Sequence, residues 1–272
     1  MIVVSPSVVL ASGGGVNANN PVVGWRNLVS TGNIAASGAA DGYPALNLAN
    51  PSTAQAQSWR GSNTAGQYLT VTVGTDEFID YLAVARHNFG SGAIVVSVEG
   101  MAVEDGSWVE LAAEMLPADD SPLLFRFVPQ ALFQIRLRLQ PSAVIPRAAV
   151  LYVDKLLVLQ RRIYVGHTPI PYGRESRVTT GVSESGNFLG RIVLGESLET
   201  SVDLQNMTPA WYRAEMDPFI AASKEAPFFF AWRPDSYPRE TGYAWMTNNP
   251  KPSNQRSNGM MQISLSMGGI AL

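Results

Sequence analysis

Apolar and polar side chains alternate along short segments between residues 67 and 159, and this period of two constrains the fold more than any other feature. Residues 133–139 alternate almost without interruption, as a strand with one buried and one hydrated face requires. Residues 78–84 have the composition of a mostly buried strand, and further short strand-like segments lie at 68–73, 93–100, 108–111, 123–127 and 150–159. Because turns and not helical patterns separate them, we predict a β-sandwich or barrel for this half of the chain.

A long β-hairpin is expected early in the second half. Residues 177–184 and 188–194 flank Ser185-Gly186-Asn187, where the glycine tolerates the positive φ of a tight turn. Residues 197–205 then alternate again between apolar and polar side chains. This pattern predicts a further strand that follows the hairpin directly.

One helix is expected after this strand. Thr208 can cap its N-terminus, and Pro209 suits the first helical position. Pro218 predicts a kink, or a second short helix capped by Asp217, because proline lacks an amide donor and disfavours helix at the preceding residue. Three further strands are predicted at 227–232, 243–246 and 260–267.

Three parts of the chain differ in composition. Residues 1–40 form a predicted flexible or extended N-terminal arm, because residues 11–40 are rich in Gly, Ala, Ser and Asn. The apolar start lacks a basic region before it and contains Pro6, so we favour a peripheral strand over a secretory signal. Residues 41–165 form the predicted sandwich, and residues 166–272 form a second, β-rich unit with one α-helix. The predicted fold class is therefore mainly β.

Composition excludes several classes of function. The chain has no cysteine, which rules out disulfides, thiolate metal sites and cysteine nucleophiles. Its net charge is −3 without a run of Lys or Arg, so sequence-specific binding of nucleic acid is not expected. No stretch of about 18 apolar residues occurs, and we therefore expect no transmembrane segment.

Catalytic and metal-binding patterns are also missing from the sequence. The two histidines, His87 and His167, have no neighbouring ligand residues in the sequence, and we interpret both as structural. Adjacent acids at 76–77, 104–105 and 119–120 lie in turns, where neighbouring carboxylates point apart into water. We expect no enzyme activity, no catalytic residue, no metal site and no cofactor.

Several short motifs in order resemble the discoidin-like family (F5/8 type C, galactose-binding-like). They lie between Ala45 and Leu159, and are residues 45–48, 58–60, 66–74, 79–90, 96–100 and 133–137. This resemblance implies a jelly-roll sandwich that binds ligands through the loops at one end.

The Ala85–Asn88 motif, followed by a hairpin, a helix and strands, is similar to tail-tip (distal-tail-like) proteins of long-tailed phages. That resemblance implies a structural virion component of the tail tip or baseplate, made in the host bacterial cytoplasm. It also implies a homo-oligomeric ring, of which we favour a hexamer over a trimer. Other tail proteins would be its partners, namely the tail tube, the hub and the tape measure, and the sandwich would contact a host surface glycan.

Four residues are candidates for ligand binding: Trp59, Arg60, His87 and Asn88. An aromatic face beside guanidinium, imidazole and amide groups is the mixture that sugar sites use. The alternative is that Trp59 plugs the base of the sandwich and Arg60 pairs nearby. A carbohydrate-binding module without a ring-forming role is the alternative function. Calcium bound by the oxygen ligands of Asp41, Asn47 or Asn50 is left open.

Overall fold

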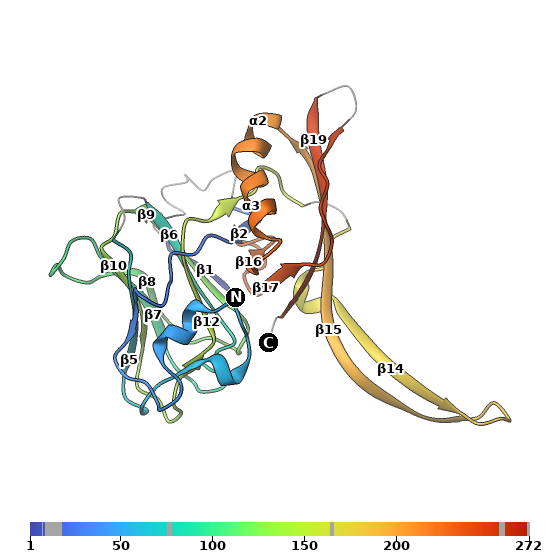
Figure 1. Cartoon of the computed structure of the whole chain (residues 1–272), viewed down its shortest axis with the longest axis horizontal. Coiled ribbons are helices and arrows are strands. Elements are labelled where there is room, and N and C mark those ends of the chain that lie inside the picture. Colours follow the sequence, from blue (N-terminus) through green and yellow to red (C-terminus); the bar gives the residue numbers. More distant parts are fainter. Residues whose placement is uncertain (7, 9–17, 75–77, 164–165, 256–258, 271–272) are drawn as a thin grey trace.

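The computed structural model describes residues 1–6, 8, 18–74, 78–163, 166–255 and 259–270. The chain is mainly β, as predicted, and its strands form stacked sheets with one helical segment (Figure 1). Most of the Gly-rich part of the predicted N-terminal arm, residues 9–17, lies outside the described residues, and so do Asp76 and Glu77.

Two facing sheets form the predicted sandwich. The first has the order β1 (Ile2–Val4), β9 (Leu123–Gln130), β6 (Ile79–Ala85) and β12 (Val150–Asp154). The second has the order β3 (Ile34–Ala36), β5 (Gln67–Thr72), β10 (Gln134–Leu139), β7 (Val96–Met101) and β8 (Val109–Met115). The alternating segments recognised in the sequence between residues 67 and 139 correspond to these strands.

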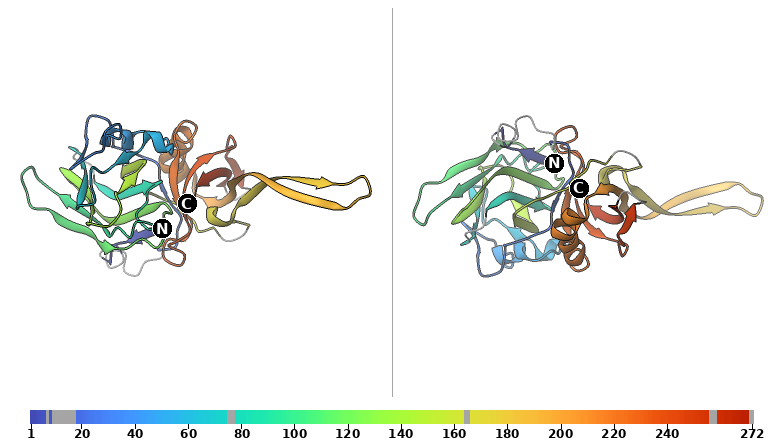
Figure 2. Two further views of the ribbon diagram at one scale, coloured as in Figure 1. Left: turned by 90° about the horizontal axis from the view of Figure 1, so that it is seen from below. Right: turned by 90° about the horizontal axis from the view of Figure 1, so that it is seen from above.

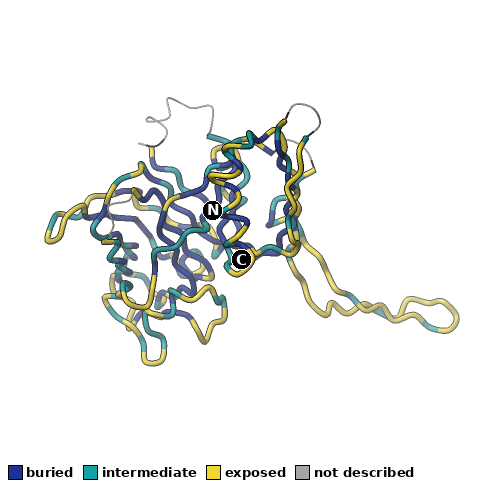
Figure 3. The backbone as a smooth tube through the Cα atoms, turned by 45° about the horizontal axis from the view of Figure 1, so that its top comes forward, coloured by how far each residue is buried: buried dark blue, intermediate teal, exposed yellow. Residues whose placement is uncertain are grey.

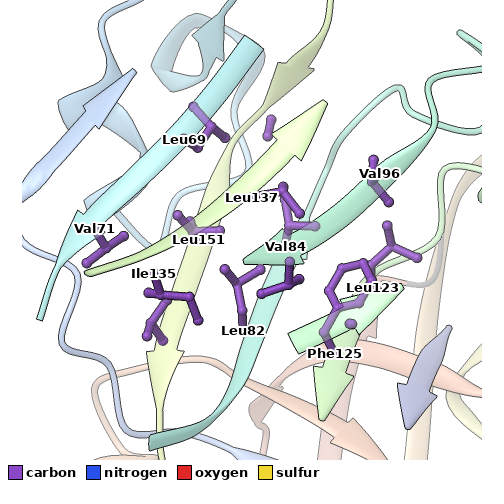
Figure 4. Packing of buried hydrophobic residues seen from close by; sticks show 14 of the residues in the cluster. Leu69, Val71, Leu82, Val84, Val96, Leu123, Phe125, Ile135, Leu137 and Leu151 are labelled. Carbon is purple, nitrogen blue, oxygen red and sulfur yellow. The ribbon is translucent and has the colours of Figure 1, made fainter. Parts of the chain in front are cut away.

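Inward-facing apolar side chains join the two sheets. Leu82 and Phe125 of the first sheet are fully buried in one cluster with Leu69 and Leu137 of the second (Figure 4). Because successive side chains of a strand alternate between faces, the same alternation that predicts β10 also supplies its half of this core. Burial in strand β10 alternates accordingly between buried and half-buried residues.

The first sheet is buried on both faces. Every residue of β6 and β12 is buried, which explains why residues 78–84 lack alternation in the sequence. Leu82 faces the sandwich core, whereas Tyr81 and Tyr152 face the other way and pack against Phe229 and Tyr243 of the C-terminal half. A shared apolar layer therefore joins the sandwich to the rest of the molecule.

The C-terminal sheet has eight strands. Its order is β13 (Leu157–Val158), β2 (Val22–Gly24), β16 (Phe228–Ala231), β17 (Thr241–Met246), β19 (Met260–Ile270), β15 (Phe188–Met207) and β14 (Arg174–Val182), with β18 (Ser253–Gln255) paired to β19. The predicted strands at 227–232, 243–246 and 260–267 are confirmed. The predicted strand at 150–159 is split, since β12 and β13 belong to different sheets.

The N-terminal segment, for which the sequence predicts a flexible or extended arm, contributes strands to the sheets. Its described residues include β1, which pairs with β9, β2, which pairs with β16, and β3, which pairs with β5. The segment thus contributes strands to all three large sheets, and the boundaries at 40 and 165 do not coincide with those of the sheets. Each of these strands has only three residues, too few for an alternating pattern to be recognised.

The predicted helix is present, but Pro218 does not divide it. Helical backbone runs through α2 (Pro209–Trp211), a π-helical turn η4 (Tyr212–Met216) and α3 (Asp217–Ala222). The amide of Asp217 donates to the carbonyl of Tyr212, five residues back. This wider turn lies directly before Pro218, where a regular helix would require an amide that proline lacks. Tyr212, Met216 and Phe219 pack on the C-terminal sheet.

The predicted long hairpin projects from the body of the molecule. It joins β14 to the first half of β15, and we call residues 174–196 the hairpin arm. Figures 1 and 2 show the arm extending away from both the sandwich and the C-terminal sheet. It is almost entirely exposed, as the yellow trace in Figure 3 shows, whereas the second half of β15 returns to the core.

Candidate functional site

The predicted ligand residue Trp59 lies in the core of the sandwich. It begins the short strand β4 (Trp59–Arg60), and its side chain is fully buried. The indole Nε1 donates to the carbonyl of Gly38 at 3.0 Å. This position matches the alternative that the sequence left open, a plug at the base of the sandwich, and leaves no ring face for a ligand.

Arg60 is exposed next to Trp59, so the alternation along β4 brings it to the surface. β4 pairs with β11 (Arg147–Ala148), and Arg60 lies directly opposite Arg147. Both arginines line one cavity of about 590 Å³ at the end of the sandwich. No carboxylate lies within ion-pair distance of either arginine among the residues that the structure describes.

His87 is buried and connects two loops that form a wall of the site. Its Nδ1 accepts from the backbone amide of Phe89 at 3.2 Å, so Nε2 carries the proton and donates to the carbonyl of Ser121 at 2.9 Å. Burial lowers the pKa of His87 to about 4, because the charged imidazolium would lose its hydration there. His87 is therefore neutral at pH 7 and acts as a structural tie.

Asn88 is also buried, and it positions Arg147. Its amide nitrogen donates to the carbonyl of Ile145 at 3.0 Å, and its oxygen accepts from the backbone amide of Arg147 at 2.8 Å. These two hydrogen bonds occupy both ends of the side-chain amide. Asn88 thus holds the 145–147 segment in place beneath the cavity wall.

A second cavity of about 460 Å³ adjoins the first. Gln55, Ser58, Ser91 and Arg147 line both cavities, and together the two spaces form what we call the end groove. The 86–92 loop and the 118–121 segment meet closely at one wall. A Cβ on Gly90 would lie 2.3 Å from the backbone of Asp119, so only glycine fits this contact.

The two halves of the end groove differ in charge. The 460 Å³ half contains Arg86 and Arg147 together with Asp119 and Asp120. Both acids are engaged, since Asp120 accepts from the amide and hydroxyl of Ser91 and Asp119 accepts from the amide of Ser121. The 590 Å³ half has Arg60 and Arg147 as its charged lining residues.

Sequence reasoning placed Arg60, His87 and Asn88 near this groove but missed Arg147 and Tyr43. Arg147 has no signal in the sequence, because it lies in an irregular stretch after Pro146 and reaches the site only by pairing with β4. Tyr43 lines the groove from the turn before the short helix η1 (Ala45–Ala49). Turn residues of this kind show no periodicity that could have marked them.

The described residues contain no group of three or more His, Asp or Glu side chains placed to hold a metal ion. Asn47, one of the oxygen ligands considered for calcium, donates its side-chain amide to the carbonyl of Ser58 at 3.0 Å. His167 hydrogen-bonds the carbonyl of Ser201 and lies against Trp232 in the C-terminal half. No helix in the described part of the chain has the length and apolar character needed to cross a bilayer.

The hairpin arm is a second candidate site, of a different kind. Phe188 and Leu189 at its tip are 68% and 69% exposed, and Ile192 and Val193 are exposed as well. Because adjacent residues of a strand point to opposite faces, Ile192 and Val193 place apolar side chains on both faces of the ribbon. Solvated surfaces seldom concentrate such side chains.

Comparisons with solved structures give matches that cover about half of the chain. No protein-family profile and no curated protein matches the chain. Among solved structures, chitosan-binding module 1 of a chitosanase/glucanase from Paenibacillus sp. IK-5 shares 12% identity, over 47% of this chain and 97% of that one, with a TM-score of 0.40. CpGH89CBM32-5 from Clostridium perfringens, in complex with GalNAc-β-1,3-galactose, also shares 12% identity over 47% of this chain and 99% of that one, at 0.40.

A third match is the CBM32 of AlyQ in complex with 4,5-unsaturated mannuronic acid, with 13% identity over 47% of this chain and 95% of that one, and a TM-score of 0.37. These structural neighbours are carbohydrate-binding modules. At such TM-scores, the likeness does not carry over what they bind. The phage tail-tip resemblance finds no counterpart in these three matches.

Proposed function

We propose that this chain is a structural, non-enzymatic subunit that assembles with further copies of itself through the hairpin arm. The observation that carries the proposal is the exposed apolar surface of a two-stranded ribbon that leaves the body of the molecule. A hairpin of this kind is at best marginally stable in water without a third strand or a packed face. A neighbouring subunit supplies the missing surface.

The charge of the arm favours a second copy over a partner of strong charge. Its ionised residues are three arginines and three glutamates: Arg174, Arg177, Arg191, Glu175, Glu184 and Glu196. These charges cancel, so the arm has no net charge that would repel the body of a second copy. β14 also lies at the edge of its sheet, where a strand can accept another chain.

An arm that reaches from one subunit onto a different surface of the next makes a head-to-tail contact. Such contacts form closed rings when the rotation closes. Together with the resemblance of the sequence to distal-tail-like proteins, this leads us to propose a ring in the tail tip of a long-tailed phage virion. The tail tube, hub and tape measure would be its neighbours, and a hexamer is the favoured ring.

Sedimentation velocity over a concentration series tests self-assembly. We expect the wild type to form a discrete oligomer, and the double variant Phe188→Ser/Ile192→Ser to remain a monomer, because it loses apolar surface on the arm. The matched control Thr180→Ser changes an exposed polar residue of the same arm and should assemble like the wild type. A wild type that stays monomeric at every concentration contradicts the proposal.

A second candidate function, binding of carbohydrate, is favoured by the end groove. The groove combines Tyr43 with amide and guanidinium groups, the mixture that orients hydroxyl-rich ligands. Binding and assembly are compatible, because the groove and the arm involve different parts of the chain. A glycan array with the wild-type protein tests this function, and silence across all glycans would contradict it.

A further inference from the structure

The end groove contains two positively charged side chains that lie next to each other. Arg60 and Arg147 are direct cross-strand partners in the β4–β11 pair, which places their Cβ atoms roughly 5 Å apart. Like charges in this position oppose folding, and a guanidinium cannot lose its charge at physiological pH. The described part of the chain gives neither arginine an ion-pair partner.

Both arginines line the 590 Å³ half of the groove, which has no acidic residue in its lining. The remaining lining residues include Tyr43, Gln55 and Ile145. The site therefore offers two positive charges, an amide and an aromatic ring within one concave space. An anion placed between the guanidinium groups would offset their repulsion and accept hydrogen bonds from both.

We propose that the end groove binds an acidic saccharide, with Arg60 and Arg147 together holding the sugar carboxylate. This inference rests on the proposed carbohydrate-binding function and adds the chemical class of the ligand. Tyr43 and Ile145 provide apolar surface for a pyranose ring, which a free inorganic anion would not use. The side-chain oxygen of Asn88 accepts from the backbone amide of Arg147 and thereby positions Arg147. Asn88 therefore acts on the ligand indirectly.

Backbone strain at the same groove also supports a binding site there. Arg86, which lines the other half, has a φ of 55°, a conformation that residues with a side chain seldom adopt. Strained residues of this kind gather at binding sites, where the surrounding contacts enforce them. The turn that contains Arg86 is enforced by the two hydrogen bonds of the neighbouring His87.

Isothermal titration of the full-length protein tests the proposal. The acidic probes are trigalacturonate and sialyllactose, and their neutral counterparts are the carboxyl-reduced trimer and lactose. We expect an acidic probe to bind about tenfold or more tightly than its neutral counterpart, as charge-assisted hydrogen bonds to a carboxylate predict. Added salt should weaken the binding, because screening reduces the attraction between the charges.

Arg60→Gln and Arg147→Gln should each reduce the affinity for the acidic probe about tenfold. The matched control Arg191→Gln removes a charge from the hairpin arm and should leave binding unchanged. Without ligand, Arg147→Gln should also raise the midpoint of thermal unfolding by up to about 3 °C, because it relieves the repulsion. A loss of stability in this variant would assign the pair a structural role and overturn the proposal.

The remaining outcomes distinguish an acidic ligand from carbohydrate binding in general. Equal binding of acidic and neutral saccharides would overturn the acidic ligand while leaving carbohydrate binding intact. If inorganic phosphate binds and neither acidic saccharide does, the ligand is not a saccharide. Absence of binding by every one of these probes would overturn the acidic ligand, whereas the carbohydrate-binding function is contradicted only by silence across the glycan array.

Discussion

The tryptophan at the base of the sandwich shows how one residue type serves two roles that a sequence cannot separate. Trp59 is an aromatic residue next to an arginine, as in many sugar sites, yet its ring is fully buried and its Nε1 is hydrogen-bonded inside the protein. Arg60, one position further, points to the surface. The sequence shows that the two residues are adjacent, but the face to which each side chain points depends on the pairing of β4 with β11.

Replacement of Trp59 by alanine should destabilise the protein by about 3–5 kcal/mol, because it opens a large cavity in the core. Urea unfolding followed by circular dichroism measures this change in the free energy of unfolding. Arg60→Ala is the matched control, and we expect this exposed residue to change the free energy of unfolding by less than about 1 kcal/mol, in the stabilising direction because the substitution relieves the repulsion from Arg147. A small effect of Trp59→Ala would contradict the buried position of the ring.

His87 should make the stability of the protein depend on pH. Its pKa is about 4 in the folded chain and 6.5 as the ordinary value, so the unfolded chain binds the proton more readily. Stability is therefore lost as the pH falls from about 6.5 to about 4. We expect the midpoint of thermal unfolding of the wild type to fall relative to that of His87→Gln over this range.

The comparison with His87→Gln at each pH is needed because Asp80 acts in the opposite direction. Burial raises the pKa of Asp80 to about 6, so its contribution is lost as the pH rises from about 4 to 6. Asp80 is present in both proteins, and its effect therefore cancels in the difference between them. A difference that stays constant from pH 7 to pH 4 would contradict the burial of a neutral His87.

At the scale of the elements, long alternating segments were predictable and short ones were not. β5, β10 and β19 each have one face against a core and one face in water. Apolar and polar residues therefore alternate along their sequences, and this alternation can be recognised. β1, β2 and β3 have three residues each, and their pairing depends on tertiary contacts that no local pattern records. The π-helical turn before Pro218 was missed because the sequence shows only that a regular helix is disturbed there.

The hairpin arm should contribute little to the stability of a single subunit, because its side chains are exposed. Removing residues 178–193 and closing the ribbon with a short turn should change the free energy of unfolding of the monomer by less than about 1 kcal/mol. Leu204→Ala, in the buried half of β15, should cost about 2–5 kcal/mol and is the control. Denaturant unfolding at concentrations where the protein is monomeric measures both, and a strongly destabilised arm deletion would contradict this account.

At the scale of the whole molecule, the boundary between the two halves is an apolar layer. Tyr81 and Tyr152 of the sandwich pack against Phe229 and Tyr243 of the C-terminal sheet. The hydroxyl of Tyr243 also donates to the carbonyl of Pro51 at 2.9 Å. The sequence predicted two units in succession, but it could not show that the N-terminal segment supplies strands to both, because this depends on long-range pairing.

We therefore expect the two halves to unfold together. Differential scanning calorimetry should show one transition whose calorimetric and van't Hoff enthalpies agree. Phe229→Ala should lower the midpoint of that single transition, since it removes buried contacts from the shared layer. Two separate transitions in the wild type would show that the layer does not couple the halves.

Electron microscopy of the purified full-length protein tests self-assembly through the hairpin arm. We expect closed particles of several subunits, in which the arm of each subunit lies on the body of the next. Particles of single subunits with free arms at every protein concentration would contradict self-assembly.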